Sequence, residues 1–250
     1  MKVSLFITCL TDQYYPRVGI ALVKVLEKLG CEIDFPQEQT CCGQPMWNNG
    51  FADETRALAK RMIEIFENAE YVVTPSGSCC AMVRDYYEDA LKDEPDWLPR
   101  AKKLAGKTYE FVEFLTKVLK FDPKEHAVSW NGDVTYHYSC HLRGIGMTDE
   151  ASNLLQQISG LGYHPLDKKE QCCGFGGTFS MKYPQISGEM ARDKTACIDK
   201  TGADTVVIND AGCAMNIEGT CRREGVQKQF TSVAEILAEG MGLLEPGGDK

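Results

Sequence analysis

The sequence predicts an α/β fold of two tandem homologous halves, each a small parallel sheet flanked by helices. Short apolar, β-branched segments alternate with longer segments whose apolar residues recur at helical spacing, which is typical of βαβ units. The same cysteine pattern also occurs twice in the 250 residues, which indicates an internal duplication. We therefore expect one cysteine-rich half over residues 1–125 and a second over residues 130–250.

The first half opens with an apolar segment, Lys2–Thr8, which predicts a buried strand. The next segment, Arg17–Leu29, carries apolar residues on one helical face, and Gly30 ends the expected helix. The other elements expected in this half are a strand at Cys31–Phe35, a helix near Glu54–Ala69, a strand at Tyr71–Pro75, a helix carrying Tyr86 and Tyr87, and a final helix near Tyr109–Leu119.

The second half repeats this order of elements. The expected elements are a strand at Val134–Tyr138, a helix around Ala151–Leu161, a short strand at Gly162–Leu166, a helix near Ile186–Thr201, a strand at Thr205–Asn209 and a closing helix at Phe230–Met241. The polar stretch Asp122–Asp133, which holds Pro123 and Gly132, is the expected join between the halves.

One frame of cysteines recurs in both halves. A first cysteine is followed by a Cys-Cys-Gly loop and later by a Cys-Ala-Met tripeptide. The spacing from the first cysteine to the pair is identical in the two halves, and the tripeptide follows at nearly the same spacing. The candidate metal ligands are Cys9, Cys41, Cys42 and Cys80 in the first half, and Cys140, Cys172, Cys173 and Cys213 in the second. Because these cysteines follow predicted strands, we expect them to converge at one sheet edge of each half.

Four thiolates at one site suggest zinc or an iron–sulfur cluster. Structural zinc usually uses C-x(2–4)-C knuckles, whereas this chain has adjacent cysteine pairs and no CxxC, which favours a cluster. Gly43 and Gly174, directly after the pairs, allow close backbone approach with N–H groups pointing at sulfurs, and Gly176 and Gly177 extend this freedom. A zinc site, a thiol–disulfide redox protein and ordinary buried cysteines remain alternatives.

The duplicated pattern resembles the cysteine-rich (CCG) domain family, which includes a component of heterodisulfide reductase and the iron–sulfur components of glycolate oxidase and anaerobic glycerol-3-phosphate dehydrogenase. The resemblance implies electron transfer through one iron–sulfur cluster in each half. Heterodisulfide-reductase-type domains close each frame with CxxC, but the first cysteine of that pair is replaced here by Gly77 and Asp210. Four cysteines per half suit two conventional [4Fe-4S] clusters.

Within this family the chain resembles the lactate utilization protein A group. The motifs that carry this resemblance are Cys42-Gly43-Gln44-Pro45 and Cys173-Gly174-Phe175-Gly176-Gly177-Thr178-Phe179-Ser180. The resemblance implies a redox subunit, without catalytic residues of its own, that serves the oxidation of L-lactate to pyruvate. It also implies a hetero-oligomer with lactate utilization proteins B and C, where B supplies ferredoxin-type clusters. Glycolate or glycerol-3-phosphate oxidation, and a zinc or thiol redox-sensing module, are the alternatives.

Several neighbouring residues leave their roles open. Cys79 competes with Cys80 as the fourth ligand of the first half, and Cys80 is preferred because it keeps the tripeptides in register. His137 and His141 flank Cys140, either as ordinary hydrogen-bonded histidines or as groups that support the metal site. Asp210 is either a loop cap or an occasional oxygen ligand.

Composition excludes several classes of function. The net charge of −9 comes without a basic stripe, so nucleic acid is not an expected partner. The apolar N-terminal run is too short for a signal peptide, and no segment approaches the ~18 apolar residues of a membrane span. We therefore expect a cytoplasmic protein whose 12 cysteines stay reduced. The sequence lacks a GxGxxG loop and a nucleophile-elbow motif.

Overall fold

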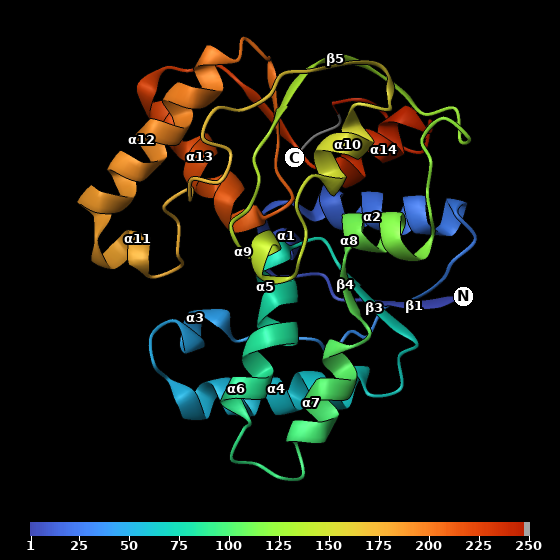
Figure 1. The fold of residues 1–250 in the computed structure, drawn as a ribbon, viewed down its shortest axis with the longest axis vertical. Coiled ribbons are helices and arrows are strands. Elements are labelled where there is room, and N and C mark those ends of the chain that lie inside the picture. Colours follow the sequence, from blue (N-terminus) through green and yellow to red (C-terminus); the bar gives the residue numbers. More distant parts are fainter. Residues whose placement is uncertain (248–250) are drawn as a thin grey trace.

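The computed structural model describes residues 1–247 and contains two four-stranded parallel sheets (Figure 1). The first sheet has the order β2-β1-β3-β4 and the second the order β6-β5-β7-β8. The strands are β1 (Lys2–Leu5), β2 (Glu32–Asp34), β3 (Tyr71–Thr74) and β4 (Thr108–Glu110), then β5 (Ser129–Tyr136), β6 (Ser159–Tyr163), β7 (Thr205–Val207) and β8 (Gln229–Thr231). The matching strand orders confirm the predicted α/β fold of two homologous halves.

Helices connect the strands in both halves. In the first half they are α1 (Cys9–Tyr14), α2 (Pro16–Lys28), α3 (Gln44–Trp47), α4 (Ala52–Phe66), α5 (Gly77–Ala81), the π-helical segment η1 (Met82–Tyr86), α6 (Tyr87–Ala90), α7 (Leu98–Ala105), α8 (Phe111–Glu113) and the π-helical segment η2 (Phe114–Val118). In the second half they are α9 (His141–Gly144), α10 (Glu150–Leu155), α11 (Phe179–Lys182), α12 (Pro184–Lys200), α13 (Ala211–Glu224) and α14 (Val233–Gly240).

The largest buried cluster lies between the halves and is shared by them. It unites apolar side chains of β1, α2 and α8 with those of β5, α10 and α14. Figure 1 shows α2 and α8 between the strands of the first sheet and helices α10 and α14, and α14 packs directly on α2. Two smaller clusters fill the other face of each sheet, one under α4, α6 and α7 and one under α12 and α13. The helices on one face of the first sheet therefore pack against helices of the second half.

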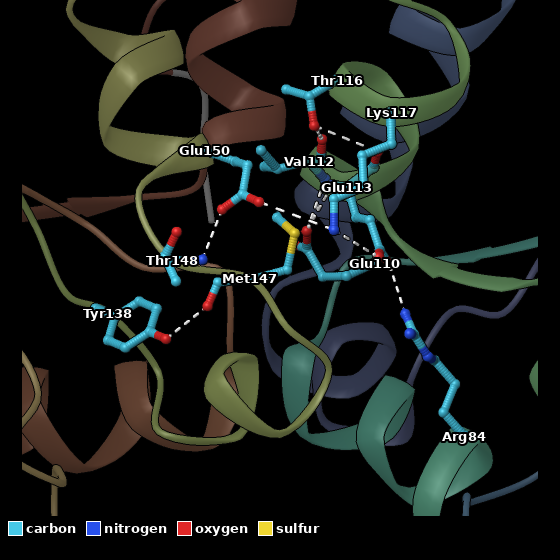
Figure 2. A network of polar contacts seen from close by, with 10 residues as sticks. All are labelled: Arg84, Glu110, Val112, Glu113, Thr116, Lys117, Tyr138, Met147, Thr148 and Glu150. Atoms are coloured by element: carbon cyan, nitrogen blue, oxygen red, sulfur yellow. Dashed lines mark hydrogen bonds and ion pairs between the residues drawn. The ribbon is translucent and has the colours of Figure 1, made fainter.

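A polar network also joins the halves at the end of β4 (Figure 2). The Glu113 carboxylate accepts a hydrogen bond from Arg84 Nη1 at 2.7 Å and another from Lys117 Nζ at 3.1 Å. Lys117 Nζ also lies 3.8 Å from Glu150 Oε1 at the start of α10. Glu113 is buried, so its contacts with Arg84 and Lys117 are less screened by solvent than surface ion pairs. The ion pair that crosses to the second half, Lys117–Glu150, is partly exposed.

The sequence prediction missed the two edge strands β4 and β8. It placed Tyr109 and Phe230 in the closing helices, but both residues lie in short strands that lead into those helices almost directly. A strand this short cannot show an alternating pattern, and its apolar side chains merge with the helical pattern that follows. The helix predicted over Ala151–Leu161 also ends early, at Leu155, because β6 begins at Ser159.

Candidate functional site

Four cysteine thiols of the first half form one group at the carboxyl ends of the strands. Cys9 begins α1 directly after β1, the pair Cys41-Cys42 lies in the loop after β2, and Cys79 lies in α5 after β3. The Cys42 thiol donates to Cys79 Sγ at 3.4 Å. Hydrogen bonds from Cys42 and Cys9 lower the pKa of Cys41 well below the usual range of a thiol. These hydrogen bonds therefore favour the thiolate form of Cys41, which is the form that binds metals.

Cys80 lies outside this group, although the sequence favoured it. Its side chain is fully buried in the core shared by the halves, beside Arg84 and Glu113. Adjacent residues at the start of a helix point in different directions, so only one of Cys79 and Cys80 can face the other thiols. The structure brings Cys79 to that position.

The register of the strands explains this difference. The N–H groups of Phe6 and His137 donate to the carbonyls of Val73 and Val207, each at 2.9 Å. Phe6 thus corresponds to His137, and Val73 corresponds to Val207.

Counting along the chain from these equivalent carbonyls pairs Cys79 with Cys213. The Cys-Ala-Met tripeptides instead pair Cys80 with Cys213. The tripeptide alignment is therefore one residue out of structural register.

The second half forms an equivalent thiol group. Cys140 precedes α9, the pair Cys172-Cys173 lies in the loop after β6, and Cys213 lies in the first turn of α13. The Cys173 thiol donates to Cys213 Sγ at 3.1 Å, and Ser139 Oγ donates to the same sulfur at 3.8 Å. Hydrogen bonds from Cys140 and Cys173 lower the pKa of Cys172 strongly. All four cysteines that the sequence singled out in this half are brought together.

The glycines after the cysteine pairs adopt the left-handed backbone conformation, with φ of 90° at Gly43 and 83° at Gly174. The Gly174 N–H donates to Cys172 Sγ at 3.4 Å, and the Gly43 N–H hydrogen-bonds Cys41 in the same way. A Cβ atom at Gly174 would lie 2.8 Å from the carbonyl oxygen of Ser187. Both the conformation and the space thus require glycine here, as the sequence pattern suggested. Gly176 and Gly177 also have positive φ values.

The two thiol groups are linked by polar contacts between the halves. His141 Nδ1 lies 3.7 Å from Cys140 Sγ, and its Nε2 lies 3.2 Å from the Gln44 amide of the first half. The carboxylate of Asp210, at the start of α13, accepts the Ser78 N–H at 3.0 Å and the Ser76 hydroxyl at 3.1 Å. Asp210 is therefore a cap, as expected, but the N–H group that it caps belongs to the first turn of α5 in the other half.

His137 is a polar side chain beside the second thiol group, and the cysteine pattern alone did not indicate its role. It is 1% exposed, and neither ring nitrogen has a hydrogen-bond partner among residues 1–247. A ring nitrogen of His137 and the sulfurs of Cys173 and Cys213 all lie within 4.8 Å of one another. Burial lowers the pKa of His137 to about 3, so the imidazole is neutral at neutral pH. A buried histidine left without a partner costs free energy unless something binds it.

The donor set fits a thiophilic metal centre in each half. Four converging sulfurs suit zinc or an iron–sulfur cluster, and hard cations that prefer oxygen are disfavoured. The unpartnered imidazole beside the second group and the backbone N–H groups aimed at sulfurs are the surroundings that tune such centres. The thiols of Cys31, Cys197 and Cys221 are buried elsewhere and have no place in either group.

A hollow of about 1020 Å³ opens away from the thiol groups, between α1 and α2 of the first half and α13 and α14 of the second. At its wall Arg17 contacts Glu239 at 2.8 Å and Glu235 at 3.6 Å. The hollow therefore gives no reason to place a substrate beside the cysteines.

Comparison with known proteins gives the class first. The family of the CCG cysteine-rich domain matches residues 3–84 and again residues 134–218, the two segments that carry the thiol groups. The chain is 51% identical over 238 residues to lactate utilization protein A of Halalkalibacterium halodurans, which covers 95% of this chain and 96% of that protein. It is 45% identical over 238 residues to lactate utilization protein A of Bacillus subtilis, covering 95% and 99%. The chain belongs to the lactate utilization protein A family of CCG cysteine-rich domain proteins.

A solved structure supports the fold. A hypothetical protein from Helicobacter pylori matches with a TM-score of 0.63 at 12% identity, covering all of this chain and 49% of that one. The chain thus spans about half the length of that protein, and the likeness concerns the fold alone. Within residues 1–247 no helix combines the length and apolar character needed to cross a membrane.

Proposed function

We propose that this protein is an electron-transfer subunit that holds one iron–sulfur cluster in each half, at the two thiol groups. The observation that carries the proposal is the convergence, in both halves, of four cysteines that lie far apart in the sequence. A bound cluster would accept and release single electrons without any change in the protein's covalent bonds.

The residues around the thiols suit this role. Neighbouring thiols and a glycine N–H lower the pKa of the first cysteine of each pair, which favours the thiolate form that binds metal. Cys42, Cys173 and Cys213 are buried, which excludes water and protects a cluster from oxidation. The first group also reaches the surface at Cys9, which is exposed and offers a short route for electrons to or from a partner.

The relatives support a metabolic pathway for the proposed electron transfer. Relatives named lactate utilization protein A, at 45% and 51% identity over nearly the whole chain, support a role in the use of lactate. We propose that the chain serves the oxidation of L-lactate to pyruvate in a cytoplasmic complex with lactate utilization proteins B and C. Loss of growth on L-lactate after deletion of the gene, with growth on pyruvate retained, is the expected result, provided that no other lactate enzyme is present.

The ligand assignment is tested by removing single thiols. The chain and its Cys79→Ser and Cys80→Ser variants are purified without oxygen and assayed for iron, acid-labile sulfide and zinc. We expect about eight irons in the wild type, a loss of about half of them in Cys79→Ser, and no loss in Cys80→Ser. Equal loss in both variants would contradict the assignment of Cys79, and zinc without sulfide would contradict the cluster itself.

A further inference from the structure

The surroundings of the two thiol groups differ at three structurally equivalent positions. The first is the residue that follows the equivalent first strands. His137 and Phe6 correspond because their N–H groups donate to corresponding carbonyls, those of Val207 and Val73. Phe6 is fully buried and packs on Phe66 with ring centroids 5.9 Å apart, whereas the buried His137 faces the sulfurs of the second group. The second group thus has an imidazole N–H donor where the first has an apolar ring.

The second position lies on the helix that covers the outer face of each sheet. Gly43 approaches Leu58 of α4 as Gly174 approaches Met190 of α12, so Leu58 and Met190 correspond. One helical turn further along each helix, this correspondence pairs Met62 with Lys194, and both side chains are buried.

The ammonium group of Lys194 is held by two backbone carbonyls of the segment that precedes the Cys172-Cys173 pair. Its Nζ donates to the carbonyls of Lys168 and Lys169 at 2.9 and 3.4 Å. Burial lowers the pKa of Lys194, whereas the nearby sulfur of Cys197 and then those of Cys173, Cys172 and Cys213 favour its charged form. The first half offers only the thioether of Met62 at this place.

The third position precedes the first cysteine of each frame. Ser139 donates its hydroxyl to Cys213 Sγ at 3.8 Å. The equivalent Thr8 instead shares its hydroxyl with Thr11 at 2.8 Å, so it is not directed at a sulfur. All three differences therefore place positive charge or a hydrogen-bond donor at the second group.

Charged groups that would oppose this difference are already paired. The carboxylate of Asp210, which lies near Cys140, accepts two hydrogen bonds from the start of α5 in the first half. In the first half Arg84 lies beside Cys80, outside the thiol group, and its charge is paired with Glu113 at 2.7 Å.

We propose that the second thiol group holds the stronger electron acceptor of the two, because His137, Lys194 and Ser139 stabilise added negative charge there. The inference rests on the proposed function. One-electron reduction, with dithionite as reductant, adds one negative charge to a cluster and breaks no bond. Nearby cations and N–H or O–H donors to sulfur raise the reduction potential, and apolar neighbours lower it. The duplication has thus produced two centres of unequal potential on one scaffold.

The potentials are measured by anaerobic redox titration with dithionite, followed by electron paramagnetic resonance. Cys213→Ser leaves the first group as the only intact one, and Cys79→Ser leaves the second, so each signal is assigned to a half. We expect the signal of the second group to appear at the higher potential. Equal potentials, or a higher potential in the first group, would overturn this inference but not the proposed function. Absence of iron and sulfide from the wild-type chain would overturn the proposed function and the inference with it.

Matched substitutions in the full chain test the cause without removing a ligand. His137→Phe and Lys194→Met install the residues that the first half carries. Each is expected to lower the potential of the second signal and to leave the first unchanged, with the iron content retained. The controls are His164→Phe and Lys200→Met, which change solvent-accessible residues of the same half.

Ser139→Ala is the mildest of these changes and provides a variant that folds if the larger ones do not. It is expected to lower the second potential by less than His137→Phe does. A second potential that stays at its wild-type value in all three variants would refute the role assigned to these residues.

Discussion

Replacing Glu110 by Gln should remove a pH dependence of stability that originates between the halves. Glu110 lies at the end of β4 and is fully buried. One carboxylate oxygen accepts the N–H groups of Val112 and Glu113 at 2.7 and 3.2 Å (Figure 2), and the other accepts the Asn209 amide of the second half at 3.1 Å. Burial raises the pKa of Glu110 from its ordinary 4.5 to about 7 despite these donors.

The sign and the size of the effect follow from this pKa. Between pH 4.5 and about 7 the unfolded chain loses the proton of Glu110 while the folded chain keeps it. The folded state therefore binds more protons, and its stability falls as the pH rises through this window. At ~1.4 kcal/mol for each unit of pKa, the loss amounts to roughly 3 kcal/mol in the wild type and is absent in Glu110→Gln.

The assay is urea unfolding at several pH values from 5 to 8, without oxygen, followed by tryptophan fluorescence. The difference in unfolding free energy between wild type and Glu110→Gln is expected to change by roughly 2.5 kcal/mol from pH 5 to 8, with the wild type losing stability as the pH rises. Glu64→Gln, which changes an exposed carboxylate, is the control and should run parallel to the wild type. Parallel curves for wild type and Glu110→Gln would refute the reasoning.

Three further outcomes are expected. Gly77→Ala places a Cβ atom 2.7 Å from Cδ2 of the buried Leu142. The substitution should lower the free energy of unfolding by about 1–2 kcal/mol, although alanine favours helices. An unchanged melting temperature would contradict this contact between the halves. Tyr87→Phe removes the hydroxyl that donates to the Cys42 carbonyl at 2.9 Å. It should lower the free energy of unfolding in urea by about 1–2 kcal/mol and speed the loss of iron to a chelator. Equal rates of iron loss from wild type and variant would contradict the second effect. Stripping the metal anaerobically should lower the melting temperature, because the thiols then lose the ligand that binds the folded state; calorimetry checks this, and restored iron and sulfide should reverse it.

The sequence was enough to predict the fold class, because the fold class depends on patterns that repeat along the chain. The alternation of strands and helices and the duplicated cysteine frame indicated two equivalent sheets and two cysteine groups. The strands β4 and β8 escaped prediction because segments so short cannot display a period.

The choice between Cys79 and Cys80 needed structural information that a sequence comparison within the chain does not hold. Aligning the two Cys-Ala-Met tripeptides favoured Cys80, since identical residues are the strongest guide when two halves of one sequence are aligned. The pairing of backbone groups between strands sets the true register, and it shifts the correspondence by one residue. The unsatisfied ring of His137 was similarly invisible, because burial and missing partners are properties of the folded chain.

The helical layer that the halves share has a consequence for how the protein is made. Helix α2 is covered by α14 (Val233–Gly240), which is synthesised only after the whole of the first half. The first half cannot complete its shared core before α14 is synthesised. We therefore expect the metal to be loaded into both halves only after α14 has been synthesised and has packed on α2.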